Sequence, residues 1–394
     1  MKGSTYSPPL ALVTAPPPRG RGTTRVVVVV FFGRRETFEI LHWHLDRNRR
    51  ASGGLIDEVV LVPNTSDEDD IKYMHGLLAS YAWYRPSSCC TYGSWEKEMQ
   101  LYGRYYAELS DRDAIYVKLD DDVVYIHDGA IEALVDTKLK FRNALVSANV
   151  INHPRLFHIH YRNGLIRRVR DGPWAAVQAR KESTISPQPT FPTSSRPCSF
   201  IDDPWGHAEH GDCGCAAAIH ESFLADLEVG RTHAWAKLDP SMGRELHESS
   251  DILMLHSDND HTCWSVNAFA LGNRNFRGIN TALLALRLLI DDEEFLSEAY
   301  PRASATAATP SGIKCIAAGS ALLVQYSYHP QAAGWCEAGN GCANVSSSSG
   351  NSSSGTEWQG GLVRDTGDSI LSRYRSYAEI AWRRWKEKGR PRTA

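Results

Sequence analysis

The segment that decides the fold runs from Ile115 to Ile126 and reads Ile115-Tyr-Val-Lys-Leu-Asp-Asp-Asp-Val-Val-Tyr-Ile126. Apolar side chains alternate with other side chains over its first half, which predicts a β-strand with two unlike faces. Three consecutive carboxylates follow, and apolar residues then resume. Three adjacent acids repel one another, so this position favours a bound cation. Because side chains alternate along a strand, Asp120 and Asp122 are predicted to face one divalent ion together.

The residues after this segment place the acids at the carboxyl end of a buried strand. A helix is predicted to start at Asp128, with Ile131, Leu134 and Val135 on one face. Open α/β sheets bind their ligands at the carboxyl ends of their strands. A solvated acidic turn is the alternative, because a DxD sequence on its own is common.

The residues before this segment predict a nucleotide-binding half of the Rossmann type. A continuous β-branched and aromatic run at 25–32 predicts a strand buried on both faces, and a helix is expected over 36–50. A second strand is expected over 55–62, and the acids within 64–70 are typical of the start of a second helix. Neither a GxGxxG nor a Walker sequence follows the first strand, which disfavours dinucleotide enzymes and P-loop kinases.

Composition sets the class of protein. The chain has 394 residues, long enough for a large core, and its 42% hydrophobic and 23% charged residues are ordinary for a soluble globular protein. A net charge of −3 gives no reason to expect a nucleic-acid partner. The longest apolar run, 26–32, is far shorter than the ~20 residues that span a bilayer, so no transmembrane segment is predicted. We expect a cytoplasmic protein, with the Golgi lumen or the cell surface as the alternative.

The segment Lys118-Leu-Asp-Asp-Asp-Val-Val-Tyr125 resembles the DxD segment of nucleotide-sugar-dependent glycosyltransferases with the GT-A fold. The chain as a whole, over about residues 25 to 331, resembles a group of fungal glycosyltransferase-like proteins. Three weaker pieces fit that group: Trp95-Glu-Lys97, Trp264-Ser-Val-Asn-Ala-Phe269 and Tyr326-Ser-Tyr-His-Pro-Gln331. The resemblance implies a GT-A (Rossmann-like) α/β fold, with a mixed, mostly parallel sheet flanked by helices in a single large domain.

The resemblance also implies ligands. Mn²⁺ or Mg²⁺ would be held by Asp122 with the help of Asp120, and it would bridge the diphosphate of a UDP- or GDP-sugar donor. Lys97, Lys118, Asp120 and Asp121 are the candidate residues for binding the nucleotide. A solvated lysine is an equally good interpretation of Lys97. The acceptor, whether glycan, protein or lipid, is not indicated.

Two further roles follow from the resemblance. An inverting enzyme needs a base, and Asp258 and Asp260 are the candidates because they precede a predicted helix over 264–271; capping of that helix is the alternative role. A third metal ligand would come from a histidine near the end of the domain. We expect that histidine where Gln325 stands, and Gln325 or His329 could substitute for it.

The predicted organisation has four parts. A disordered leader covers 1–24, and the glycosyltransferase-like domain covers 25–335, with a flexible acceptor-side insertion at 166–204. A Ser/Gly-rich linker covers 336–361. A basic helix is expected within 362–394, docked on the domain, on a partner or on an anionic membrane.

Three functions are therefore open. The first is a metal-dependent glycosyltransferase. The second is a non-catalytic relative that binds a partner or a glycan, which the glutamine at 325 and the insertion favour. The third is a metal-dependent nucleotidyl- or phosphotransferase on a similar sheet.

Overall fold

The computed structural model describes residues 24–88, 105–106, 109, 111, 113–153, 156, 159–160, 163–166, 213–238, 252–254, 268–271, 315–326 and 370–388. The chain divides into two compact units. The first, here called the sheet unit, comprises Met1–Ile151, Trp235–Gln325 and Arg375–Ala394. The second comprises Asn152–Ala234 and Tyr326–Tyr374.

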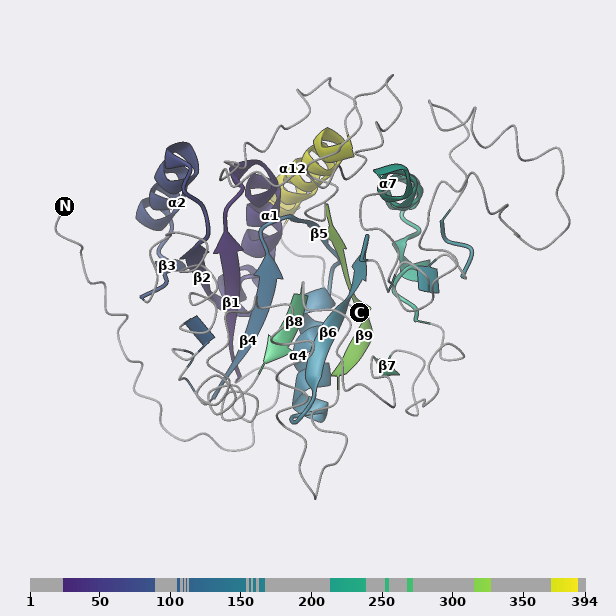
Figure 1. Ribbon diagram of the computed structural model, residues 1–394, viewed down its shortest axis with the longest axis horizontal. Helices are drawn as coiled ribbons and strands as arrows, with labels where there is room; N and C mark the ends of the chain where they lie inside the picture. The colour runs from purple at the N-terminus through teal and green to yellow at the C-terminus, as the bar shows by residue number, and fades with distance from the viewer. Residues whose placement is uncertain are drawn as a thin grey trace, which may run out of the picture. The chain divides into compact units, whose positions relative to one another are not determined.

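All described strands belong to one sheet (Figure 1). Its order is β3-β2-β1-β4-β8-β6-β9-β5, and β7 pairs with β9. The strands are β1 Arg25–Phe32, β2 Ile56–Pro63, β3 Tyr84–Pro86, β4 Ala114–Asp120, β5 Val123–Ile126, β6 Leu145–Ile151, β7 Ile252–Met254, β8 Ala268–Leu271 and β9 Cys315–Gln325.

The sheet is parallel in one half and mixed in the other. Strands β3, β2, β1 and β4 are parallel neighbours, and 3-2-1-4 is the first part of the 3-2-1-4-5-6 order of doubly wound nucleotide-binding sheets. Beyond β4, β8 runs antiparallel to both β4 and β6, whereas β9 is parallel to β6. The predicted α/β fold with a mixed sheet flanked by helices is confirmed.

Three helices of the sheet unit follow strands directly: α1 Arg35–Asn48, α2 Glu68–Ser80 and α4 Ala130–Lys140. Helix α1 packs against β5, and α4 packs against β6 and β9. The acids before α2 act as predicted, because Asp67 is the N-cap and its side chain accepts hydrogen bonds from the backbone N–H of Asp69 and Asp70 at 2.9 and 3.0 Å.

Strand β1 forms the centre of the core. Every residue from Val26 to Phe32 is at most 5% exposed, as the uninterrupted apolar run predicted. Full burial of such a side chain contributes about 1.5–3 kcal/mol. Phe32 packs edge-on against Phe38 of α1, with ring centroids 5.0 Å apart. The core therefore joins β1 to the helix that follows it.

The predicted helix over 264–271 is wrong where the structure describes it. Ala268–Leu271 form β8, whose residues pair with β4 on one side and with β6 on the other. A short apolar run carries no period that distinguishes a buried strand from a helix, and here both neighbouring strands supply hydrogen-bond partners.

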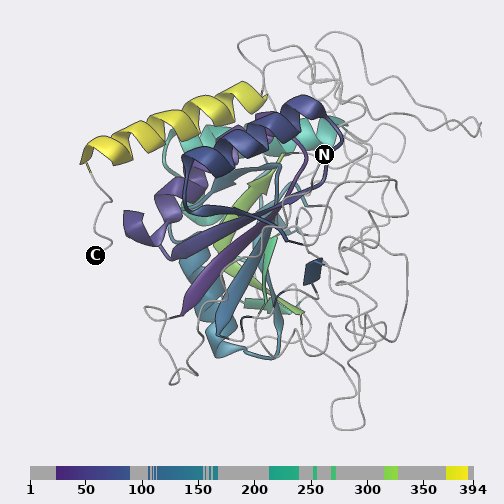
Figure 2. The same cartoon turned by 90° about the vertical axis from the view of Figure 1, so that its left-hand side faces the viewer.

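Helix α12, Ile370–Lys388, contacts α1 through the residues that belong to the sheet unit, and the two helices lie side by side in both views (Figures 1 and 2). Arg375 reaches Glu39 at 2.5 Å and donates to the backbone carbonyl of Glu36 at 3.0 Å. The indole N–H of Trp382 donates to Asp46 at 2.8 Å. This part of the predicted basic helix is therefore held along α1.

None of the described helices has both the length and the apolar composition needed to cross a membrane.

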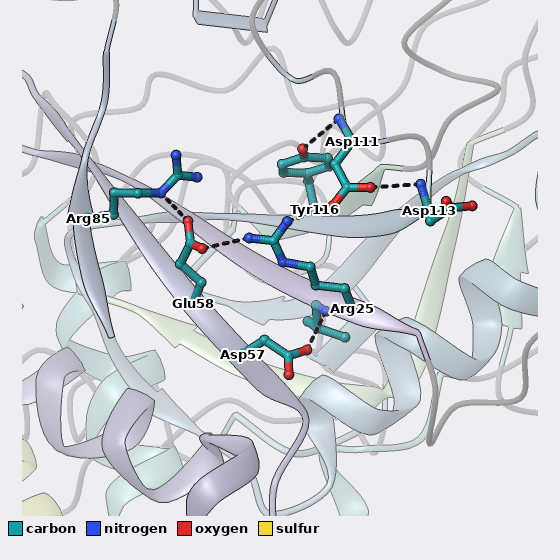
Figure 3. A network of polar contacts seen from close by, with 8 residues as sticks. Arg25, Asp57, Glu58, Arg85, Asp111, Asp113 and Tyr116 are labelled. Atoms are coloured by element: carbon teal, nitrogen blue, oxygen red, sulfur yellow. Dashed lines mark hydrogen bonds and ion pairs between the residues drawn. The ribbon is translucent and has the colours of Figure 1, made fainter. Parts of the chain in front are cut away.

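A network of ion pairs lies at the amino ends of the parallel strands (Figure 3). Arg25 at the start of β1 reaches Glu58 at 2.7 Å and Asp111 at 2.6 Å, and Glu58 also pairs with Arg85. Asp57 accepts a hydrogen bond from the backbone N–H of Val26 at 2.8 Å. Partly exposed ion pairs contribute little energy one by one, so their main effect here is to keep the strand ends in register.

In the second unit, His220 of α7, Cys213–Glu228, contacts two other described segments. Its Nδ1 lies 3.0 Å from the Tyr374 hydroxyl, and its Nε2 lies 2.9 Å from the Tyr326 carbonyl. Arg373 pairs with Glu221 at 2.5 Å and with Glu228 at 2.6 Å.

The predicted leader, insertion and linker lie outside the described residues, apart from Thr24 and Ile166.

Buried histidine makes the stability of the sheet unit sensitive to acid. His44 of α1 is 1% exposed, and burial lowers its pKa from 6.5 to about 3. The native state therefore binds fewer protons than the unfolded state below pH 6.5, and stability falls as the pH falls. We expect a loss of about 2 kcal/mol from His44 between pH 6.5 and 5.

Urea unfolding at the two pH values checks this prediction. His44→Leu should reduce the difference between them by about 2 kcal/mol. His75→Leu, at an exposed position of α2, is the control and should keep the wild-type difference. An unchanged pH dependence in His44→Leu would contradict the burial of a neutral histidine.

Candidate functional site

The site is built where the carboxyl ends of β1, β2 and β4 meet. Phe31 of β1 pairs with Asp120 of β4, and Phe32 pairs with Pro63 of β2. Parallel strands end at the same edge of a sheet, so the residues that follow them are brought together there. These are Gly33 and Arg34 after β1, Asn64 after β2, and Asp121 and Asp122 after β4.

Asp121 is fixed at the amino end of α1. Its side chain is 4% exposed, and one oxygen accepts from Nε of Arg34 at 2.9 Å and also from Nη2 of the same guanidinium. The other oxygen accepts from the backbone N–H of Gly33 at 2.7 Å. A helix amino end favours a negative charge. Asp121 is therefore a buried anion with a full set of strong partners.

The two flanking acids have different cations. Asp122 is 1% exposed and lies 3.3 Å from Nη1 of Arg34. Asp120 lies 2.6 Å from Nζ of Lys118, and its side chain is 20% exposed whereas that of Lys118 is 5% exposed. Three carboxylates thus face two cations, which leaves one excess negative charge among these five groups.

The negative charges of the acids shift the pKa of Arg34. Burial on its own lowers the pKa of Arg34, but the negative charges of Asp121 and Asp122 outweigh that effect and raise the pKa above its ordinary value. Arg34 consequently stays charged at any pH at which the protein is folded.

Gly33 is needed because two backbone segments approach each other closely. A Cβ atom at this position would lie 2.7 Å from the carbonyl oxygen of Asn64 and 3.5 Å from Oδ2 of Asp121. The backbone N–H of Asn64 in turn donates to the carbonyl of Phe32 at 2.6 Å. Glycine therefore lets the turn after β1 lie against the turn after β2.

The structure brings four of the predicted residues together, namely Lys118, Asp120, Asp121 and Asp122. Gln325 is buried and pairs in the sheet with Val123, the residue next to Asp122. The position expected for a third ligand therefore lies opposite the residue that follows the acids. Lys97, Asp258, Asp260 and His329 lie outside the described residues.

Sequence reasoning missed Arg34. The basic residues predicted for the site were Lys118, on the strand that carries the acids, and Lys97, on the predicted helix before that strand. The available signal was a basic residue directly after a strand that ends in glycine, since a neighbouring parallel strand would place it at the same edge. Arg34 lies 87 positions from Asp121 in the chain.

The donor set suits a hard divalent cation. Within the described part of the chain, no group of three or more His, Cys, Asp and Glu side chains is placed to hold a metal ion. Magnesium sites, however, commonly use one or two carboxylates together with substrate phosphates. Strand β4 ends at Asp120, so strand alternation does not set the direction of Asp122 as predicted; Asp122 shares Arg34 with Asp121, and Asp120 pairs with Lys118. Carboxylate ligands and an excess of negative charge among these groups suit a hard cation such as Mn²⁺ or Mg²⁺.

Comparison with known proteins gives weak matches only. The sequence matches no protein family profile and no curated protein. Among solved structures, it is similar to 4-diphosphocytidyl-2C-methyl-D-erythritol synthase from Anaerococcus prevotii, with 15% identity, a TM-score of 0.25, and coverage of 33% of this chain and 56% of that one.

Glucosyl-3-phosphoglycerate synthase from Mycobacterium tuberculosis, in complex with Mn²⁺ and UDP-glucose, matches with 21% identity and a TM-score of 0.25, over 33% of this chain and 45% of that one. Its complex with Mn²⁺ and UDP matches with 20% identity and a TM-score of 0.25, over 36% and 52%. The chain thus spans about half the length of these proteins. TM-scores this low do not establish a shared fold.

Replacement of Gly33 tests the close approach. We expect Gly33→Ala to lower the free energy of unfolding by about 1–3 kcal/mol, because the added methyl group meets backbone that cannot move aside without shifting a strand end. The control is Gly76→Ala on the exposed side of α2, where nothing lies within 4 Å. It should raise the free energy of unfolding by roughly 0.5–1 kcal/mol, since alanine is the better helix former. Urea unfolding measures both, and a gain in Gly33→Ala would contradict the packing.

Proposed function

We propose that the chain is a metal-dependent glycosyltransferase that transfers a sugar from a UDP- or GDP-sugar to an acceptor. One observation carries the proposal. Three carboxylates with two cations stand at the carboxyl edge of the 3-2-1-4 strands, where sheets of this order bind nucleotides. The resemblance of residues 118–125 to a DxD segment points to a nucleotide sugar among the possible nucleotides.

Each acidic or basic residue of the site would have a separate role in the proposed reaction. Asp122 and Asp120 would hold Mn²⁺ or Mg²⁺, and a bound ion of this kind supplies positive charge for a departing diphosphate. Lys118 positions Asp120 through their 2.6 Å contact. Asp121 holds the start of α1 in place and so sets the position of Arg34.

Other roles rest on the resemblance alone. Asp258 or Asp260 would take the proton of the acceptor hydroxyl if the reaction inverts, and neither is required if it retains. Lys97 would contact the phosphates. His329 or Gln325 would complete the metal site, and Gln325 has the support of its place opposite Val123.

Nucleotide binding tests the proposal. Calorimetry with UDP and with GDP, in the presence and absence of Mn²⁺, should show binding of one nucleotide that depends on the metal. Asp122→Asn should weaken the metal-dependent binding by at least about tenfold, because a neutral amide is a poor ligand for a hard cation.

A matched control is available in the same segment. Asp128→Asn makes the same change at a side chain that is 66% exposed and paired with Arg47, and it should leave binding unchanged. Equal affinity in wild type and Asp122→Asn, with both proteins folded, would refute the metal role of Asp122.

The products separate the alternatives. A glycosyltransferase releases nucleoside diphosphate, whereas a nucleotidyltransferase releases pyrophosphate. The non-catalytic binding protein is favoured by glutamine at position 325, where the resemblance implies histidine, and by the predicted insertion at 166–204. Metal-dependent binding of UDP or GDP with no release of either product from a panel of nucleotide sugars and nucleotides would support it.

A further inference from the structure

Arg34 connects the buried acids to solvent. Its side chain is 36% exposed, whereas those of Asp121 and Asp122 are 4% and 1% exposed. Arg34 is therefore more exposed than either of the two acids that it contacts. Arginine also retains N–H groups beyond those used for Asp121 and Asp122, because a guanidinium carries five.

The two contacts of Arg34 differ in strength. One oxygen of Asp121 accepts hydrogen bonds from Nε of Arg34 at 2.9 Å and from Nη2 of the same residue, and the other oxygen accepts one from the backbone N–H of Gly33. Asp122 forms an ion pair with Nη1 of Arg34 at the longer distance of 3.3 Å. Asp121 thus keeps a fixed anchor if the guanidinium shifts, while the contact with Asp122 is the one that a competitor displaces more easily.

A divalent cation at Asp122 would compete with this contact. Lys118 pairs with Asp120, and Arg34 is a cation that contacts both Asp121 and Asp122. Two positive groups that approach one carboxylate repel each other, and the repulsion is little screened at a buried site.

We propose that Arg34 is an exchangeable counter-ion of the acid cluster. In the metal-free protein it balances Asp122. A divalent cation displaces it from Asp122, and the guanidinium then binds the diphosphate of the nucleotide. The inference rests on the proposed function, since it assumes that the acids bind a metal and that the edge binds a nucleotide. The planar fork of donors in arginine suits phosphate oxygens.

The exchange predicts effects of opposite sign in Arg34→Gln. Loss of the competing charge should tighten the binding of Mn²⁺ alone by about tenfold. Loss of the guanidinium should weaken the binding of UDP or GDP at saturating Mn²⁺ by about fivefold or more. A merely structural role would weaken both, because a disordered site binds neither ligand well.

The experiment is calorimetry with MnCl₂ alone, and then with nucleotide at saturating Mn²⁺, on wild type, Arg34→Gln and Arg35→Gln at constant ionic strength. Arg35→Gln removes the same charge one residue further on, where the side chain is 52% exposed and pairs with Glu39 at 2.8 Å. It should change each affinity by less than about twofold. Circular dichroism establishes that each variant is folded.

The outcomes are distinct. Mn²⁺ affinity in Arg34→Gln that is equal to or weaker than in wild type would overturn the exchange and leave the metal site intact. Absence of Mn²⁺ binding in all three proteins would overturn the exchange together with the proposed function. If Arg34→Gln does not fold, Arg34→Lys replaces it, because one ammonium group cannot serve both acids, and the same two opposite changes are expected with smaller size.

Discussion

The candidate site depends on the contact between Asp121 and the start of α1. A carboxylate taken out of water costs several kcal/mol unless it is paired and hydrogen-bonded. The guanidinium of Arg34 and the backbone N–H of Gly33 supply those partners. Because both groups belong to the turn between β1 and α1, the same contact ties the end of β4 to that turn.

The two ends of the parallel strands differ in charge balance. At the amino ends, Arg25 and Arg85 pair with Glu58 and Asp111 in a network whose members are partly exposed. Water screens such pairs, and they do not require a ligand. At the carboxyl ends, by contrast, three acids share two cations and two of those acids are almost fully buried. Water therefore screens Asp121 and Asp122 less than it screens the acids at the amino ends.

Helix α1 is held at more than one place, which matters because Arg34 is its N-cap residue. Asp121 holds its amino end, and Phe38 packs its underside onto Phe32 of β1. Arg375 of α12 contacts Glu36 and Glu39 near the start of the helix, and Trp382 contacts Asp46 further along. A group that is to position a ligand needs a rigid support, and these contacts provide it for the backbone of Arg34.

The sequence by itself determined the strand at 25–32, the strand that leads into Asp120, a helix start within 64–70 and the place of the acids at a strand end, because apolar period, capping and strand alternation are local properties. It brought Lys118 and the three acids into one candidate site. Only the tertiary structure decided that Asp121 is committed to Arg34, that Ala268–Leu271 form a strand, and that Gln325 stands opposite Val123. These depend on strand order and register between segments far apart in the chain, and no local pattern encodes which strand becomes the neighbour of another.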